Sequence, residues 1–173
     1  MAPTITRSIV TFDLDSTLCD TRHRHPMIDR VNGTDWSAYS KACVNDAIIP
    51  AAERLVHLLS KTHDIHYVSG RTESARKETL DWLAAHGLPV HGLWLDDTPG
   101  EDHFAAYGGH AQYKVARVKQ VEEGTGQKVL MHVDDWAEVA VALTAAGYPT
   151  ICVRTPSEVE DLVNPRFDNA SLA

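Results

Sequence analysis

The chain has 173 residues, of which 43% are hydrophobic and 23% are charged, a composition typical of a globular protein with one compact domain over residues 1–173. Its 16 Lys and Arg residues against 24 Asp and Glu residues give a formal net charge of -8, which argues against tight, sequence-independent binding of long nucleic acids. The three cysteines, Cys19, Cys43 and Cys152, lie far apart without a C-x-x-C pair, which argues against a disulfide framework and a zinc ribbon.

The first seven residues lack the charged start and long apolar core of a secretory signal, and no apolar run approaches the length needed to span a membrane. We therefore expect a cytoplasmic protein without a membrane partner.

The first predicted element is a strand in residues 8–18, where an apolar run ends in Asp13 and Asp15. Carboxylates that follow a buried strand must lie at its edge, which is where ligands bind in open α/β sheets. The two side chains point the same way in an extended chain, unless a turn begins at Leu14. Because close carboxylates repel, the pair predicts a hard-metal site or an acid/base couple. The alternative is a turn or a helix cap.

Residues 19–47 are too polar to form a second core, and we predict that they form a small cap over the carboxyl end of the first strand. A short helical pattern runs through Trp36, Tyr39 and Ala42, with Thr34 or Asp35 as its cap. Arg22 and Arg24 in this segment are candidate substrate contacts, although a short basic run is more often a solvated loop.

The rest of the chain alternates predicted helices and strands. After a polar turn at residues 69–72, Gly87, Gly124 and Gly147 are expected to end three of the helices, and residues 155–173 are predicted to be a surface tail. Alternation of this kind predicts a mainly parallel, three-layer α/β sheet. The helices are predicted at residues 51–61, 73–86, 111–123 and 136–146, and the later strands at 65–68, 93–95, 129–133 and 150–153.

Polar residues follow three of the predicted strands, namely Asp13 with Asp15, Ser69-Gly70-Arg71, and Asp134-Asp135. Lys114 lies near the start of a predicted helix, where a cation is electrostatically unfavourable and another role is expected. Carboxylates bind Mg²⁺ through oxygen, while a hydroxyl, exposed amides and a lysine bind phosphate oxygens. The set predicts a phosphate pocket with a metal.

These motifs resemble those of the haloacid dehalogenase (HAD) superfamily, which match Asp13-Leu14-Asp15-Ser16-Thr17, Ser69, Lys114 and Asp134-Asp135 in that order. The resemblance covers roughly residues 8–153. It implies a Rossmann-like, HAD-type fold with a small cap after the first strand, and a phosphatase, because an aspartate at position 15 favours phosphatase over dehalogenase chemistry.

The resemblance also implies roles for the site residues. Asp13 would be the nucleophile that forms an aspartyl-phosphate, and Asp15 the acid/base that protonates the leaving oxygen and later activates water. Mg²⁺ would be held by Asp13, the backbone carbonyl of Asp15 and Asp134, with Asp135 assisting through water. The remaining expected roles are phosphoryl-oxygen binding by Ser69 and the Gly70 amide, loop orientation by Thr17, charge balance by Lys114, and either a substrate contact or a surface ion pair for Arg71.

Several of these features are similar to the 3′-phosphatase domain of phage polynucleotide kinases, although Trp136 stands where that group usually has an arginine and no G-x-x-x-x-G-K-[ST] stretch is present. We therefore expect a Mg²⁺-dependent phosphomonoesterase for free nucleotides or 3′ ends of polynucleotides. The alternatives are a phosphatase of another small metabolite, a phosphotransferase, and a non-catalytic phosphate or nucleotide binder, which would not need Asp15.

The aromatic residues divide into two predicted groups. Trp36, Tyr39 and Trp136 are candidates for stacking on a base, whereas Trp82 and Trp94 are expected in the core. His103 and His110 flank a glycine-containing loop, and no second pair with zinc-ligand spacing accompanies them, so a loop without metal is favoured.

Overall fold

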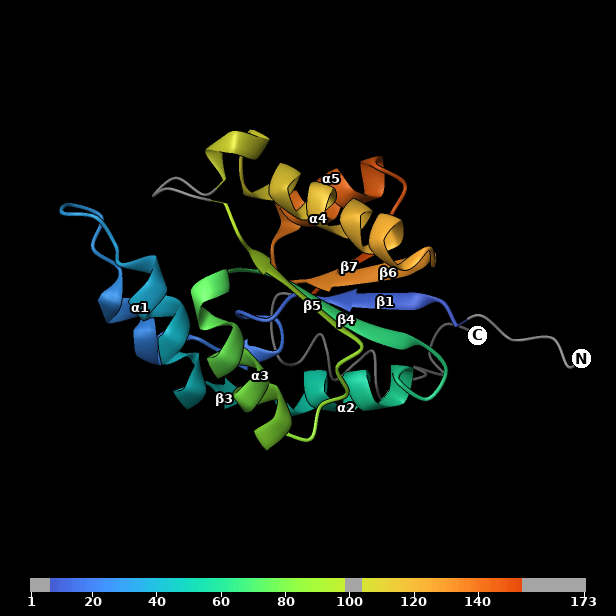
Figure 1. The fold of residues 1–173 in the computed structure, drawn as a ribbon, viewed down its shortest axis with the longest axis horizontal. Helices are drawn as coiled ribbons and strands as arrows, with labels where there is room; N and C mark the ends of the chain where they lie inside the picture. The colour runs from blue at the N-terminus through green and yellow to red at the C-terminus, as the bar shows by residue number, and fades with distance from the viewer. Residues whose placement is uncertain (1–6, 99–103, 154–173) are drawn as a thin grey trace, which may run out of the picture.

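A five-stranded parallel sheet forms the centre of the computed structural model, which describes residues 7–98 and 104–153 (Figure 1). Its strand order is β5-β4-β1-β6-β7, and each pair of neighbours is parallel. The first strand therefore lies in the middle, with the later strands added on both sides. The strands are β1 (Ile9–Phe12), β4 (Asp64–Thr72), β5 (Gly92–Asp96), β6 (Val129–Asp134) and β7 (Thr150–Cys152).

Helices cover both faces of this sheet, with α2 and α3 on one face and α4 and α5 on the other (Figure 1). Val10 and Phe12 of β1 pack in the core on the first face, while Ile9 packs with residues of α4 and α5 on the second. Side chains alternate along a strand, so an apolar run such as that of β1 suits a sheet buried on both faces. The predicted three-layer α/β fold is confirmed. The helices are α2 (Pro50–Leu59), α3 (Arg76–Ala85), α4 (His110–Thr125) and α5 (Ala137–Ala145), with single 3-10 turns at Glu73–Ala75 and Ala105–Tyr107.

The cap follows β1 and lies beyond the carboxyl end of that strand (Figure 1). Its helix α1 (Trp36–Lys41) begins as the sequence indicates, because the Asp35 carboxylate accepts a hydrogen bond from the Ala38 N–H at 2.9 Å. Its unpredicted parts are two 3-10 turns, Arg22–Met27 and Ala42–Asn45, and a two-stranded antiparallel sheet of β2 (Cys19–Asp20) and β3 (Ala47–Ile48).

The predicted turn at residues 69–72 is wrong, because these residues continue β4 as far as Thr72, which pairs with Asp96 of β5 across an irregularity. Ser69 and Arg71 are buried, at 1% and 2% exposure. Their polarity suggested a turn, but buried partners of opposite charge allow an arginine inside a strand.

Gly124 is also not the end of its helix. α4 continues to Thr125 and ends at Gly126, whose φ of +67° suits glycine. Gly124 has a packing role instead, since a Cβ there would lie 3.0 Å from Cη2 of Trp94. The predicted tail at residues 155–173 and His103 lie outside the described residues.

Within the described part of the chain, none of the helices has the length and apolarity that crossing a membrane would require.

Gly92, at the start of β5, provides a test of this packing. A Cβ there would lie 2.3 Å from Nδ1 of His66, the atom that accepts a hydrogen bond from Nε1 of Trp94 at 3.1 Å. Gly92→Ala should displace the His66 ring and lower the free energy of unfolding by about 1 to 3 kcal/mol, measured by urea denaturation. In a His66→Ala background the same substitution should cost clearly less. An equal cost in both backgrounds would contradict this account.

Candidate active site

A tight turn after β1 separates Asp13 from Asp15. The Asp13 N–H still donates to the Val133 carbonyl of β6 at 2.8 Å, whereas the Leu18 N–H donates back to the Leu14 carbonyl at 2.8 Å. Ser16, within the turn, has a φ of +65°. The chain therefore leaves the extended form at once, and the two carboxylates enter different surroundings instead of pointing the same way.

Asp13 joins a cluster of three carboxylates with Asp134, the last residue of β6, and Asp135. One carboxylate oxygen from each lies within 4.8 Å of the others. The Thr17 hydroxyl lies between two of these carboxylates, 3.2 Å from Oδ2 of Asp13 and 3.3 Å from Oδ1 of Asp135. Because hard cations prefer oxygen ligands, this donor set fits Mg²⁺.

Lys114 supplies the cation of this cluster within the protein. Its side chain is fully buried, and Nζ donates to Oδ1 of Asp13, to Oδ2 of Asp134 at 3.1 Å and to the Val68 carbonyl at 3.0 Å. A lysine near a helix start is explained by this pairing, since buried carboxylates are stable only when they are paired.

Burial and mutual repulsion perturb the three carboxylates unequally. Burial raises the pKa of Asp13 above its ordinary range, although Lys114 opposes the shift. Burial and the neighbouring Asp134 raise the pKa of Asp135 to about 6. Asp134 is buried as well, yet Lys114 and His132 hold its pKa below the ordinary range. Hence the cluster retains bound protons close to neutral pH.

His132 is a member of this site that the sequence analysis missed. It is fully buried in β6, with Nδ1 2.8 Å from the Thr11 hydroxyl and Nε2 3.1 Å from Oδ2 of Asp134. Burial lowers its pKa, which favours a neutral ring that accepts from Thr11 and donates to Asp134. A histidine two residues before the aspartate that ends a strand, and hence on the same face, was the available signal.

Asp15 is paired with two arginines. Its Oδ1 accepts hydrogen bonds from Nη2 of Arg24 at 2.7 Å and from Nε of Arg71 at 2.8 Å. Although burial raises the pKa of Asp15, the charges of Arg71 and Arg24 lower it to about 2. Asp15 is therefore an anion in the ligand-free protein, and both guanidinium groups are engaged by protein carboxylates.

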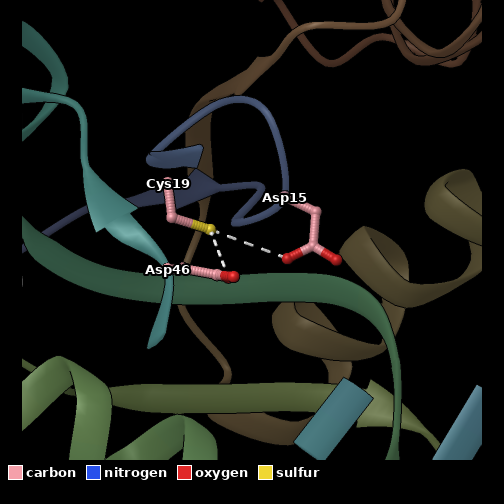
Figure 2. A group of neighbouring side chains, drawn as sticks. All are labelled: Asp15, Cys19 and Asp46. Atoms are coloured by element: carbon pink, nitrogen blue, oxygen red, sulfur yellow. Dashed lines mark hydrogen bonds between the residues drawn. The ribbon is translucent and has the colours of Figure 1, made fainter. Parts of the chain in front are cut away.

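Asp46 and Cys19 complete this second group, and neither was predicted to belong to it. Figure 2 shows the Cys19 thiol pointing toward both carboxylates, with Sγ 3.1 Å from Oδ2 of Asp46 and 3.7 Å from Oδ1 of Asp15. The three side chains have a spacing that suits a metal ion. However, the charges of Arg24 and Arg71 already balance the two carboxylates, so this group is an ion-pair network and does not favour a cation.

A cavity of about 410 Å³ lies above both groups. Asp13, Asp15, Ser69, Gly70 and Arg71 line its polar part. Its aromatic lining comes from Trp36 and Tyr39 of the cap, from Phe104 before α4 and His110 at the start of that helix, and from Trp136 after β6.

The aromatic side chains contact one another on each wall. The Trp36 and Tyr39 rings are 5.5 Å apart, and the His110 ring lies 4.6 Å from both Phe104 and Trp136. Thus the aromatic candidates named from the sequence do line the cavity, and Phe104 and His110 are additions. Trp82 is buried at 2% exposure, and Trp94 packs beside the core.

The cavity does not include every predicted substrate contact. The side chain of Arg22 is 83% exposed and pairs with Asp20, and Arg24 is buried beneath the cavity lining. Substrate binding by these two residues stays a prediction.

A comparison with protein-family models matches residues 4–145 to the family described as HAD superfamily, subfamily IIIB (Acid phosphatase). Comparison with curated proteins gave no match.

Several solved structures share the fold. A chain of the Pnkp1/Rnl/Hen1 RNA repair complex is 18% identical, with a TM-score of 0.60, over 87% of this chain and 43% of that chain. The present chain thus spans less than half of its length. The HAD-like hydrolase SP0104 from Streptococcus pneumoniae is 12% identical, with a TM-score of 0.55 over 92% of each chain. The putative HAD hydrolase YfnB from Bacillus subtilis, bound to magnesium, is 12% identical, with a TM-score of 0.56 over 91% of this chain and 99% of that chain.

Lys114→Met should destabilise the protein, because it leaves buried carboxylates without their cation, at a cost of about 3 to 5 kcal/mol. Lys114 holds the folded-state pKa of Asp134 below the ordinary range, so without it that pKa would rise above the unfolded value and the folded protein would take up a proton before the unfolded chain as pH falls. The deficit should therefore be largest near pH 8 and shrink toward pH 5. Denaturant unfolding at several pH values, with a chelator present, measures the loss of stability and its dependence on pH. Lys119→Met, at an exposed lysine of α4, is the control, and a deficit independent of pH would refute this electrostatic explanation.

Proposed function

Because the chain belongs to the HAD superfamily, subfamily IIIB (acid phosphatase), we propose that this phosphatase is a Mg²⁺-dependent phosphomonoesterase that works through an aspartyl-phosphate and acts on nucleotide-type phosphates. The observation that carries the proposal is the position of Asp13. It lines the cavity and also belongs to the three-carboxylate cluster that Lys114 balances.

Asp13, Asp134 and Asp135 would hold Mg²⁺, with the backbone carbonyl of Asp15 as the further ligand that the sequence resemblance implies. When bound, the ion would neutralise the charge between the carboxylates and the phosphoryl group. Lys114 and His132 would keep this pair in place, since Lys114 donates hydrogen bonds to both Asp13 and Asp134 and His132 donates one to Asp134.

In the proposed reaction, a carboxylate oxygen of Asp13 attacks phosphorus and the bond from phosphorus to the ester oxygen breaks. The leaving oxygen takes a proton from Asp15. Asp15 then accepts a proton from water, whose oxygen attacks the aspartyl-phosphate and releases inorganic phosphate with Asp13 restored. The Ser69 hydroxyl and the Gly70 amide, at the cavity, would hold the phosphoryl oxygens.

Three features support a nucleotide-type phosphate as the substrate. The cavity is of a size that suits a small ligand, and aromatic rings from the cap and the core line it, as base stacking requires. A similar fold occurs in a protein of an RNA repair complex. The net charge of -8 favours a single nucleotide or a short 3′ end over a long strand.

The function is tested by measuring phosphate release with Mg²⁺ from 3′-phosphorylated oligonucleotides, nucleoside monophosphates and sugar phosphates in parallel. We expect turnover of at least one nucleotide class, loss of activity with a chelator, and no turnover by Asp13→Asn, which should remain folded by circular dichroism. Far faster turnover of sugar phosphates would refute the substrate assignment, and an active Asp13→Asn variant would refute the covalent mechanism.

Binding of Mg²⁺ should weaken as pH falls. The raised pKa of Asp13 and the pKa of about 6 of Asp135 mean that protons occupy the metal-free cluster near neutrality and must leave when a cation binds. Between pH 8 and pH 5 the affinity should fall by up to about tenfold per pH unit for each proton displaced. Titration calorimetry in two buffers of different ionisation enthalpy measures affinity and proton release. Asp135→Asn should flatten the dependence near pH 6, and pH-independent binding would contradict the proposed ligand set.

A further inference from the structure

We propose that Asp46 is a positioning residue for the reaction. It holds the acid/base Asp15 in its working orientation by orienting the two arginines that donate hydrogen bonds to Asp15. The inference rests on the proposed role of Asp15 as the proton donor to the leaving group. Asp46 itself lies outside the cavity lining.

The Asp46 carboxylate is fully buried and accepts hydrogen bonds at both oxygens. Arg24 donates to it twice, from Nε to Oδ1 at 2.9 Å and from Nη2 to Oδ2 at 2.7 Å. Arg71 donates from Nη2 to Oδ2 at 3.0 Å. Because a planar guanidinium held at two points has a fixed orientation, Asp46 fixes the orientation of Arg24, and its single hydrogen bond helps to orient Arg71.

Each arginine also reaches Asp15. Nη2 of Arg24 lies 2.7 Å from Oδ2 of Asp46 and 2.7 Å from Oδ1 of Asp15, and Nη2 of Arg71 lies 2.7 Å from that same Asp15 oxygen. Two carboxylates and two guanidinium groups therefore form a closed, charge-balanced ring. Among the described residues, the hydrogen bonds to the Asp15 carboxylate all end on Oδ1, which leaves Oδ2 for the leaving group.

The ring connects the cap to the sheet. Arg24 and Asp46 come from the cap, whereas Arg71 lies in β4 and the indole Nε1 of Trp82 in α3 donates to the Asp46 carbonyl at 2.8 Å. His23, with its side chain 38% exposed, adds a contact from Nε2 to Oδ1 of Asp46 at 2.7 Å. Removing the Asp46 charge would leave two buried arginines with one charged carboxylate between them. It would weaken the two hydrogen bonds that orient Arg24 and the one that Arg71 makes to Asp46.

A misplaced proton donor has a specific kinetic signature. An ester with a poor, alcohol-type leaving group needs a proton on the departing oxygen, whereas p-nitrophenolate leaves readily without one. Asp46→Asn should therefore lower kcat/KM for a nucleoside monophosphate by about 100-fold, within the range of general acid catalysis, and kcat/KM for p-nitrophenyl phosphate by less than about fivefold. The comparison uses kcat/KM because this quantity covers the steps up to departure of the leaving group, whereas the later proton transfer from water to Asp15 is common to both esters.

Two reference variants separate the proposal from the function on which it rests. Asp15→Asn should show the same selective loss in kcat/KM, and equal losses of kcat/KM on both esters in that variant would contradict the proposed role of Asp15 as the acid. Asp29→Asn makes the same chemical change in the cap, at a residue whose carboxylate accepts hydrogen bonds from Val31 and Asn32, and should leave the ratio of the two kcat/KM values unchanged. If Asp15→Asn is selective but Asp46→Asn lowers the hydrolysis of both esters equally, or lowers neither, the positioning role is wrong.

His23→Ala tests the positioning role of Asp46 if Asp46→Asn does not fold. It removes one partly exposed contact to Asp46 and keeps all four charges of the ring, so it should fold and shift the ratio in the same direction by about threefold, as expected for the loss of one hydrogen bond. An unchanged ratio in a folded His23→Ala protein, alongside an unfolded Asp46→Asn protein, would assign Asp46 to stability alone. A wild-type protein that hydrolyses neither ester would overturn the proposed function and this inference with it.

Discussion

The pairing of buried carboxylates with buried cations is the constraint on which this site depends. Asp13, Asp46 and Asp134 are each at most 6% exposed, and an isolated charge of that kind is too costly to keep. Lys114 balances the charges of Asp13 and Asp134. Arg24 and Arg71 balance that of Asp46. The arrangement of the carboxyl edge of the sheet follows from which cation reaches which carboxylate.

This constraint also determines what the cap does. A segment of 3-10 turns, one short helix and a two-residue strand pair is attached to the sheet by hydrogen bonds, such as that from the Thr72 N–H to Oγ of Ser40, and also by an ionic attachment. Arg24 provides that attachment because it is a cap residue bound to carboxylates on both sides of the boundary. Trp36 and Tyr39 of this cap line the cavity together with Phe104, His110 and Trp136.

The sequence predicted the sheet, the cap and the order of the chemical motifs, because these depend on hydrophobic periodicity and on residues adjacent to strand ends. It did not predict β4 past Val68, where polarity suggested a turn but Arg71 finds buried partners 25 and 56 residues away. Asp46 and His132 were missed for the same reason. Their roles come from tertiary contacts, and a single aspartate in a polar segment or a histidine in a strand has no distinctive local pattern. Gly124 was misread because packing against Trp94, and not helix termination, requires a glycine there.

Two aspartates only two residues apart thus have opposite electrostatic surroundings. Burial beside Asp134 and Asp135 raises the pKa of Asp13 in spite of Lys114, whereas Arg71 and Arg24 lower that of Asp15 in spite of burial. Such a divergence between neighbouring carboxyl groups is how one fold assigns them different tasks. In the proposed reaction neither group starts in its working state, because the nucleophile must be an anion and the acid must carry a proton. A cation can displace the proton from the Asp13 cluster, and a phosphate monoester, whose second pKa is about 6, can bring one to Asp15 when it binds as the monoanion. In this proposal, binding of the cation and of the substrate therefore brings Asp13 and Asp15 into the protonation states that the reaction requires.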